Sequence, residues 1–564
     1  MDLRPIACTC SNMLGPDYQP QQTTFRVFAQ APAVVLNLYH PTRHLKMHPT
    51  PGGVWKITVK GDLKNRPYTF TANGHEVIDP YARRVTAHDG RGIVSADHTP
   101  IAPRPTFAKQ DSVIYELHLR DFTPDGKYSS LKAQIPHLLE LGVNTVQILP
   151  LCEFANGDQY GWGYDSVHFN APETSYARQN PVRELKQMID SLHKANLKVV
   201  MDMVYNHTME NHQRIYSFQG LAPNYYYRMK SPRTFWNGSG VGNEFNSEAP
   251  MARQFIKDSL KIWVNEYQVD GFRFDLMGLI DKQTLRQIRQ ELPPEILIYG
   301  EPWAAGPTPI KVTGKGDQEG WAVFNDDFRD ALKGSVFRPT EGGYVQINTN
   351  LDKVKQGLMG SIDTFARSPL EVINYVECHD NHTLADRLTL SAPQATPEER
   401  LQMNRLAAVA VFTAQGIPFI QAGQEFARSK QLEDNTYNLG DAVNKIRWQD
   451  KRTQQDLFDY YRGLIALRKA HPVFRQTSAA QIRASLSFTD PPISLCLQNQ
   501  PGDSWKRARV LFNARPVAQV YPLEPGPWQV YVNATQAGPS PLQEVQTQVE
   551  LPPRSAMVLA QKEL

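Results

Sequence analysis

A repeated alternation of short apolar segments and helical segments constrains the fold most strongly, and it runs from about Ser112 to about residue 474. Segments with helical periodicity, such as 185–189 and 252–256, separate the apolar runs. Strands that alternate with helices pair in parallel, so eight such units over about 360 residues predict a (β/α)8 barrel with long insertions. The eight candidate strands are residues 113–117, 145–149, 199–202, 271–274, 296–299, 322–324, 372–376 and 417–420.

Both ends of the chain are instead rich in strand-like patterns. Apolar and polar residues alternate at 24–29, 34–39 and 54–60 and again at 509–512, 528–532 and 556–560. A chain of 564 residues is too long for one core. We therefore expect a multidomain α/β protein with an N-terminal β-sandwich at 1–108, a catalytic barrel at 109–474 and a C-terminal β-sandwich at 475–564. The barrel is expected to carry an insertion at about 208–250, which is rich in Tyr, Asn, Gly and Pro.

Charge and composition exclude several kinds of partner. The net charge is only +3 and no Lys/Arg run stands out, so we expect no nucleic-acid or membrane partner. No run of 18 apolar residues occurs, and the N-terminus has no signal-peptide pattern. Five cysteines are scattered, and the close pair Cys8 and Cys10 has no second pair to complete a zinc site. We expect a cytoplasmic monomer.

Charged residues occupy strand ends where a buried strand should be most apolar. Arg273 and Asp275 alternate with Phe272 and Phe274 in one such strand. Burying a guanidinium and a carboxylate costs several kcal/mol unless both are paired. The ends of barrel strands share the face where active sites form. Polar groups at the other strand ends are Asp202, Asn206, His207, Glu301, His379, Asp380, Asn381, His382, Gln424 and Glu425.

Three kinds of chemistry could use such a set of side chains. The histidines follow different strands without a His-x-His or His-x3-His pair, which disfavours a catalytic metal. No Gly-x-Ser-x-Gly motif supports a serine hydrolase. Paired carboxylates that flank a scissile acetal fit best. We expect no required cofactor and no catalytic metal; Asp202 and Asn206 could hold structural calcium or serve as hydrogen-bonding groups, and the sequence leaves both open.

Four segments resemble the signature regions of the α-amylase family, in the order of that family. They are Val200–His207 (VMDMVYNH), Gly271–Asp275 (GFRFD), Gly300–Trp303 (GEPW) and Glu377–Asn381 (ECHDN). The resemblance implies that Asp275 is the nucleophile, Glu301 the general acid/base and Asp380 the transition-state stabiliser. It also implies that His207, Arg273 and His379 line the subsite of the attacked sugar, and that the configuration at the anomeric carbon is retained.

A narrower resemblance concerns the loops. Residues 160–165 (YGWGYD) are similar to an element of type I pullulanases, which implies that Tyr164 stacks on the sugar with Asp165 beside it. Residues 422–426 (AGQEF) and 435–438 (NTYN) are also similar to pullulanase segments. The full set of expected substrate-binding residues is Trp162, Tyr164, Asp165, His207, Arg273, Trp303, His379, Asn381, Asn435 and Tyr437. The N-terminal sandwich resembles a starch-binding-type module.

The resemblance implies a debranching hydrolase that cleaves α-1,6-glucosidic bonds in pullulan, limit dextrins or branched glycogen. Ser166, Pro302 and the pair Glu377–Cys378 depart from the common pullulanase pattern. An isoamylase-like enzyme and an α-1,4-glucan hydrolase or transferase therefore stay open as alternatives. A carbohydrate-binding protein with an inactive barrel is a fourth hypothesis, which the intact carboxylates Asp275, Glu301 and Asp380 disfavour.

Overall fold

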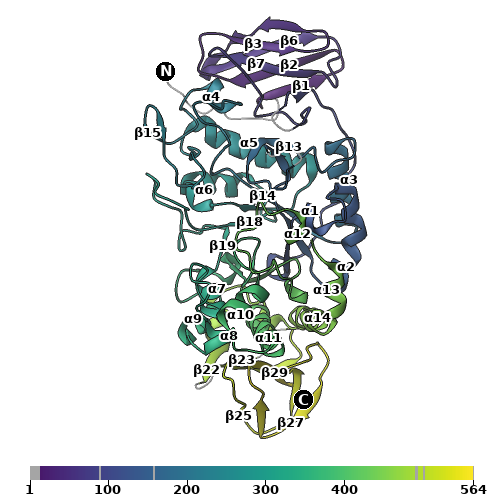
Figure 1. Cartoon of the computed structure of the whole chain (residues 1–564), viewed down its shortest axis with the longest axis vertical. Helices are drawn as coiled ribbons and strands as arrows, with labels where there is room; N and C mark the ends of the chain where they lie inside the picture. Colours follow the sequence, from purple (N-terminus) through teal and green to yellow (C-terminus); the bar gives the residue numbers. More distant parts are fainter. Residues whose placement is uncertain (1–12, 88–89, 156–158, 490–492, 499–501, 563–564) are drawn as a thin grey trace. The chain divides into compact units, whose positions relative to one another are not determined.

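The computed structural model describes residues 13–87, 90–155, 159–489, 493–498 and 502–562 (Figure 1). Cys8 and Cys10 lie outside this part of the chain. The chain divides into two compact units, and each unit combines separate stretches of sequence. The first unit contains the described residues up to Pro105 with 123–132 and 148–319. The second unit contains 106–122, 133–147 and 320 to the C-terminal end.

Eight parallel strands close into a barrel in the order of the sequence, which confirms the predicted (β/α)8 fold. Each strand agrees with its predicted range to within two residues at either end. Apolar runs this short and this fully buried are typical of parallel strands, which helices cover on one face. The strands are β10 (Ile114–Leu117), β11 (Thr145–Ile148), β14 (Lys198–Met203), β17 (Gly271–Phe274), β18 (Leu297–Gly300), β19 (Ala322–Phe324), β20 (Val372–Asn374) and β21 (Ile417–Gln421).

The registers of two strand pairs place polar residues next to each other at strand ends. In the first unit, β14 pairs with β17 so that Asp202 lies opposite Arg273. In the second unit, β10 pairs with β21 so that Glu116 lies opposite Gln421. All four side chains are buried. Their polar groups therefore need partners within the protein.

Helices lie between the strands, and local capping explains where several of them begin. Asn180 caps α3 by accepting a hydrogen bond from the backbone N–H of Arg183 (3.2 Å), with Pro181 in the first turn. Thr396 and Glu399 form a capping box at the start of α11. The longer helices are α2 (Ile135–Leu141), α3 (Pro181–Lys194), α5 (Pro250–Tyr267), α6 (Lys282–Glu291), α7 (Asp326–Lys333), α9 (Leu351–Leu358), α10 (Leu384–Ser391), α11 (Pro397–Thr413), α13 (Trp448–Thr453), α14 (Gln455–Ala470) and α15 (Ala479–Ser485). The single-turn helices are α1 (Leu119–Phe122), α4 (Phe218–Leu221), α8 (Tyr344–Ile347) and α12 (Asp441–Asn444).

Two segments of the first unit extend the minimal barrel pattern. An antiparallel hairpin of β12 (Cys152–Phe154) and β13 (Ser166–Pro172) carries the residues that resemble the pullulanase element. The predicted insertion at about 208–250 contains α4 and a small hairpin of β15 (Met229–Ser231) and β16 (Thr234–Phe235). This insertion ends where α5 begins at Pro250.

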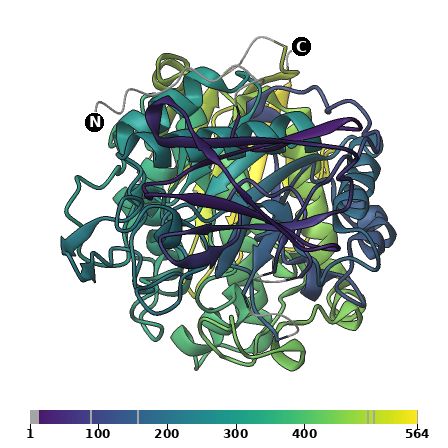
Figure 2. The ribbon, with the colours of Figure 1, turned by 90° about the horizontal axis from the view of Figure 1, so that it is seen from above.

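The N-terminal part of the first unit is a β-sandwich whose strands are the purple arrows seen from above in Figure 2. One sheet has the order β1-β2-β6-β5, and the other has β4-β3-β7-β8 with β9 beside β7. Phe25 and Val27 from one sheet pack with Leu36 and Phe70 from the other in a single core. The strands are β1 (Gly15–Gln19), β2 (Gln22–Phe28), β3 (Val34–Leu38), β4 (Arg43–Lys46), β5 (His48–Pro49), β6 (Val54–Lys60), β7 (Pro67–Ala72), β8 (His75–Val77) and β9 (Gly92–Ile93).

The C-terminal part of the second unit is also built of antiparallel strands. Its larger sheet has the order β22-β23-β24-β29-β26-β27, and β25 pairs with β28. Leu511, Trp528, Leu551 and Leu559 lie in its apolar core. The strands are β22 (Leu486–Thr489), β23 (Ser494–Gln498), β24 (Trp505–Asn513), β25 (Gln519–Pro522), β26 (Trp528–Val532), β27 (Gln543–Val545), β28 (Gln548–Leu551) and β29 (Ser555–Lys562). The predicted domain boundaries at 108/109 and 474/475 stay predictions.

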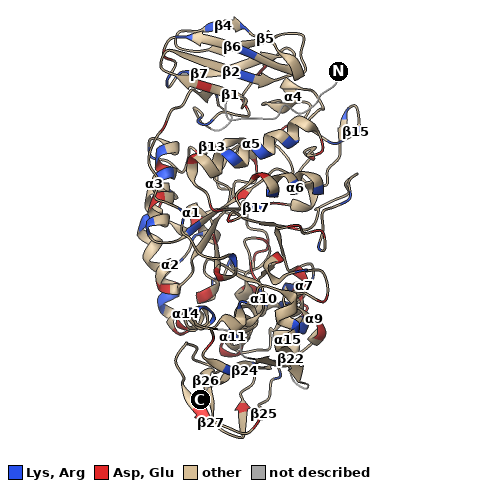
Figure 3. Ribbon diagram, turned by 180° about the vertical axis from the view of Figure 1, so that it is seen from behind, with Lys and Arg blue, Asp and Glu red and all other residues tan. Residues whose placement is uncertain are grey.

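Charges of both signs are interspersed along the surface helices, as the small net charge leads us to expect. The helices α3 and α5 each carry basic and acidic residues (Figure 3). Within the described residues, no helix has both the length and the apolar character needed to cross a bilayer.

Candidate active site

The first cluster of candidate residues is organised around Arg273 at the end of β17. Its Nη1 donates to both carboxylate oxygens of Asp202 (2.9 and 3.1 Å) and to Oδ1 of Asp275 (2.9 Å), and its Nη2 lies 2.6 Å from Oε1 of Glu301. Burial alone would lower the pKa of Arg273, but the nearby Asp202, Glu301, Tyr164 and Asp275 outweigh burial and raise it well above its ordinary value. The guanidinium is therefore a fixed positive charge among three carboxylates.

Asp275 receives a second hydrogen bond from the end of β14. Asn206 Nδ2 donates to Oδ2 of Asp275 (2.7 Å) and to its backbone carbonyl (3.0 Å). With Arg273 on Oδ1, both carboxylate oxygens are thus oriented by the protein. The side chain keeps 15% of its surface exposed. Asp275 is consequently both held in place and accessible to a ligand.

Glu301, at the end of β18, is held against the same strand end. Its Oε2 accepts from the backbone N–H of Leu276 (2.8 Å), and Oε1 faces Arg273. Leu276 has a φ of +39°, a left-handed conformation that is unfavourable for a branched side chain. Such strain is typical of functional sites. Here the strained residue is the one that directs its N–H at Glu301.

Tyr164 and His207 complete this cluster from neighbouring segments. The Tyr164 hydroxyl donates to Oδ2 of Asp202 (2.7 Å), and its carbonyl oxygen lies 2.9 Å from Nε2 of His207. Nδ1 of His207 lies 2.6 Å from Oδ1 of Asn206. Burial lowers the pKa of His207, against the opposite effects of Asp275 and the Tyr164 carbonyl. The β12–β13 hairpin is thereby tied to β14 and β17.

The other aromatic candidates of the first unit differ in exposure. Trp162 is only 5% exposed, and its indole N–H donates to the Tyr160 hydroxyl (3.2 Å). Trp303 is partly exposed in the loop after Glu301, and Asp165 is partly exposed next to Tyr164. Sugar contacts by these three residues stay predictions.

A second cluster lies in the second unit, around Glu116 at the end of β10. Glu116 accepts from the backbone N–H of His379 (2.7 Å) and from the Gln147 amide (3.0 Å), and its Oε1 is 2.8 Å from Nδ1 of His379. Nε2 of His379 is 3.6 Å from Oδ1 of Asp380. The Asp380 side chain is 43% exposed. Glu116 thus orients His379, and His379 faces Asp380, the candidate transition-state stabiliser.

The segment after β20 is anchored by further polar contacts within this unit. Asn381 has a φ of +65°, and its backbone N–H donates to Oδ1 of Asn435 (3.0 Å). Lys430 Nζ donates to the carbonyl of His379 (3.1 Å). Tyr437 is 56% exposed. The structure therefore joins His379, Asn381 and Asn435 and leaves Tyr437 accessible.

Buried charges surround this anchored segment. Burial lowers the pKa of Lys430 to about 8 and raises the pKa of Glu377 to about 7. Glu377 accepts from the backbone N–H of Leu384 (2.7 Å), which ties the segment to the start of α10. Glu377 is one of the departures from the common pullulanase pattern, and here it supports the chain next to Asp380.

Among the described residues, no group of three or more His, Cys, Asp or Glu side chains could hold a metal ion. Both oxygens of Asp202 accept from Arg273, and Asn206 bonds Asp275 and His207, which favours the hydrogen-bonding alternative for this pair. Structural calcium stays a prediction. Cys152, Cys378 and Cys496 are free thiols.

Most of the chain, including the residues of both clusters, matches a known protein family. The family described as the alpha amylase catalytic domain matches residues 81–234 and 237–449, which is more than half of the chain. The chain belongs to the α-amylase family. The matched ranges include Asp275, Glu301 and Asp380, and the catalytic roles of these three residues stay predictions.

Other comparisons extend this membership to debranching relatives. Carbohydrate-binding module 48, the isoamylase N-terminal domain, matches residues 13–82. The chain is 36% identical to the pullulanase of Bacillus subtilis (strain 168), over 89% of this chain and 78% of that protein. It is 31% identical to an isoamylase of a Flavobacterium species, over 73% of this chain and 66% of that protein. The chain is also similar to a solved structure, the type I pullulanase from B. subtilis str. 168 complexed with maltose. The two structures superpose over 98% of this chain and 86% of the pullulanase chain, with a TM-score of 0.93 and 34% sequence identity.

Sequence reasoning missed Glu116 and Lys430 as members of the site. Glu116 was detectable, because it is a carboxylate at the end of an apolar candidate strand, as Asp202 and Glu301 are. Lys430 had no local signal. It lies 51 positions from His379, and only the folded chain brings its ammonium group to that carbonyl.

Proposed function

We propose that this α-amylase-family enzyme hydrolyses α-1,6-glucosidic bonds in pullulan, limit dextrins and short-branched glucans by a retaining double displacement. The supporting observation is that Arg273 holds both Asp275 (2.9 Å) and Glu301 (2.6 Å) at neighbouring strand ends. Similarity to pullulanases and isoamylases supports the α-1,6 bond as the target. A relative's crystal structure carries maltose, which supports an α-glucan substrate.

In the first step, a carboxylate oxygen of Asp275 attacks the anomeric carbon of the sugar. The bond from that carbon to the oxygen of the leaving sugar breaks, and Glu301 protonates this oxygen. Arg273 and Asn206 orient the attacking carboxylate. In the second step, Glu301 takes a proton from water, and the resulting hydroxide displaces Asp275 from the sugar.

Glu301 must carry a proton to act as the acid. Without substrate, the Arg273 guanidinium and the Leu276 N–H both bond its carboxylate oxygens, and such bonds favour the ionised form. We propose that the bound sugar separates Glu301 from Arg273, so that Glu301 becomes protonated when the leaving oxygen is in place. Asp380 and His379 are proposed to stabilise the positive charge that develops on the sugar ring.

The loops are proposed to select the branch point. Tyr164 is held by Asp202, and its ring would stack on the attacked sugar. Trp162, Asp165, Trp303, Asn381, Asn435 and Tyr437 are proposed as further substrate contacts. We also propose a cytoplasmic monomer without a required cofactor, for which gel filtration and an assay after dialysis against EDTA are the direct tests.

Product analysis with pullulan and, separately, with amylose tests the proposal. We expect maltotriose from pullulan and no product from amylose. Panose or isopanose from pullulan, or maltose from amylose, would indicate an α-1,4-specific enzyme. Debranching of amylopectin with pullulan left intact would indicate an isoamylase-like enzyme, which the 31% identity to an isoamylase makes the second candidate. No product from any glucan would contradict hydrolysis.

A further inference from the structure

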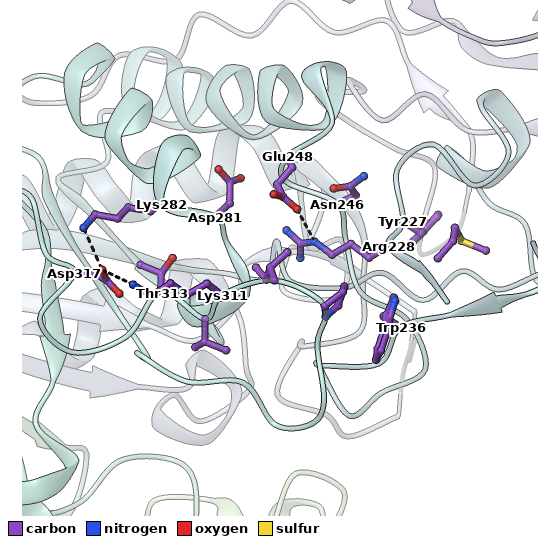
Figure 4. A pocket seen from close by; sticks show the side chains of 14 residues that line it. Tyr227, Arg228, Trp236, Asn246, Glu248, Asp281, Lys282, Lys311, Thr313 and Asp317 are labelled. Carbon is purple, nitrogen blue, oxygen red and sulfur yellow. Dashed lines mark hydrogen bonds and ion pairs between the residues drawn. The ribbon is translucent and has the colours of Figure 1, made fainter. Parts of the chain in front are cut away.

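A cavity of about 670 Å³ lies in the first unit, and its lining contains none of the proposed catalytic or substrate-binding residues. Such a volume is within the range of small-molecule sites. Three segments line it: 227–248 from the insertion, the start of α6, and 309–317 from the loop that follows β18. Figure 4 shows Lys282 and Asp317 at one end, Tyr227 and Trp236 at the other, and Arg228 with Glu248 between them.

The walls of this cavity are connected by buried hydrogen bonds. Glu244, which is fully buried, accepts from Arg228 Nη1 (2.7 Å), the Thr308 hydroxyl (2.6 Å) and the backbone N–H of Gly238 (3.0 Å). The carbonyl of Gly238 accepts from the backbone N–H groups of Ala305 and Gly306 (2.9 Å each). Side chains and backbone thus join the insertion to the loop after β18. A cavity with such walls is largely preformed.

The lining charges balance, which indicates a neutral ligand. The lining contains three cations, Arg228, Lys282 and Lys311, and three carboxylates, those of Glu248, Asp281 and Asp317. Asp317 is 3.1 Å from Lys282 and 3.7 Å from Lys311, and Glu248 is 3.5 Å from Nε of Arg228. Cations already paired in this way are poor attractors for phosphate or a polyanion.

The lining also combines an aromatic surface with polar groups in the way that suits a sugar. Trp236 is partly exposed and can offer its flat indole to the apolar face of a sugar ring. Asn246, Asp281 and Asp317 can bond hydroxyl groups. The Arg228 side chain is only 4% exposed, and its Nε, although 3.5 Å from Oε2 of Glu248, makes no hydrogen bond among the described residues. A ligand hydroxyl could accept from this buried donor.

We propose that this cavity is an accessory binding site for a short stretch of α-glucan, with Trp236 as the stacking surface and Arg228 as a donor. The choice of α-glucan among neutral oligosaccharides rests on the proposed function. One wall of the cavity belongs to the loop that begins at Glu301. If the cavity binds one segment of a long polymer, the rest of that polymer stays near the enzyme.

Equilibrium dialysis with labelled maltotriose tests the site in the Glu301→Gln background, where turnover is suppressed. We expect the double variant Glu301→Gln/Trp236→Ala to bind one maltotriose fewer per protein than Glu301→Gln binds. If the site is retained, its Kd for maltotriose should be about tenfold or more higher. Phe337→Ala is the matched control, because Phe337 is an aromatic residue that is 89% exposed and does not line this cavity. An unchanged number and affinity of sites after Trp236→Ala would overturn the proposal, as would an equal loss in the control.

A crystal structure of Glu301→Gln soaked with maltotriose tests the same proposal without a change in the cavity. We expect sugar density against Trp236, and a cavity without sugar at saturating maltotriose would overturn the proposal. Activity gives an independent readout: Trp236→Ala should raise KM for long pullulan several-fold and leave kcat on a short branched oligosaccharide unchanged. If wild-type protein releases no product from pullulan, the proposed function fails, while dialysis still reports whether the cavity binds glucan.

Discussion

Arg273 determines how the two candidate carboxylates stand before a substrate arrives. A guanidinium has several donors in a fixed plane, so it can hold Asp202, Asp275 and Glu301 at the same time. A buried arginine without partners would be strongly unfavourable, but this one has three. The three carboxylates therefore offset the cost of burying Arg273. The same contacts align Asp275 and Glu301, the groups proposed to do the chemistry.

Neutralising either proposed catalytic carboxylate should abolish most activity and preserve the fold. Glu301→Gln removes the proton donor, and general acid/base catalysis is typically worth about 10²–10⁴-fold. Asp275→Asn removes the nucleophile and should cost at least as much. Steady-state hydrolysis of pullulan, together with circular dichroism and thermal melts, measures both effects. Near wild-type turnover in either variant would contradict the assigned roles.

His168 in β13 should make the protein less stable in acid. Burial lowers its pKa to about 4, against the Gly90 carbonyl, which raises it. The unfolded value is about 6.5, so the unfolded chain takes up a proton that the folded chain does not. The stabilisation is therefore complete above pH 6.5 and is lost as the pH falls toward 4. Between pH 7 and pH 5, this group should cost about 2 kcal/mol of the free energy of unfolding.

Urea unfolding of His168→Gln at both pH values checks this expectation. Glutamine can still donate to the Gly90 carbonyl but does not titrate, so the stability loss between pH 7 and pH 5 should shrink. His98→Gln, at an exposed histidine, is the control and should leave the loss unchanged. Equal losses in wild-type protein and His168→Gln would show that His168 is not responsible.

At the scale of the elements, polar strand ends are the signal that located the site. The ends of β14, β17 and β18 carry Asp202, Arg273 and Glu301, and all three were visible in the sequence as charges that follow apolar runs. The strand positions were predictable for the same reason, since short apolar runs bounded by polar residues leave little freedom in where a strand begins or ends. Hydrogen-bonding partners from other elements had no such local pattern.

Gly463 in α14 shows where packing overrides helix propensity. In the interior of an exposed helix, replacing glycine with alanine stabilises by about 1 kcal/mol. Here a methyl group at position 463 would overlap the carbonyl oxygen of Ala537. We therefore expect Gly463→Ala to destabilise the protein by about 1–3 kcal/mol. A thermal melt decides between these opposite signs, and a higher melting temperature would contradict the close packing.

At the scale of the whole molecule, the two compact units interleave along the sequence. The second unit takes β10 from residues 106–122, most of β11 from residues 133–147, and its remaining barrel strands from beyond residue 320. A single cut after residue 319 therefore separates strands that belong to one unit. In the intact chain β10 pairs with β21, so the cut would expose an edge of β21.

The fragment 320–564 should accordingly fail to fold cooperatively on its own. We expect it to aggregate or to unfold without a sharp transition in urea. The fragment 13–105 is the matched control, because both of its sheets are complete within residues 15–93, and it should be soluble with a β-type circular dichroism spectrum. A sharp, reversible transition for the fragment 320–564 would contradict this reading of the units.

The sequence by itself determined the barrel strands, the two β-rich ends and the signature carboxylates, because each depends on a pattern within a few neighbouring residues. Tertiary structure alone decided the contacts between distant residues. Glu116 meets His379 from 263 positions away, and Glu244 meets Thr308 from 64 positions away. Such pairs leave no periodicity to read, since a buried polar group needs a partner but its sequence does not say which one. The accessory cavity depends on partners of this kind, so only the folded chain reveals it.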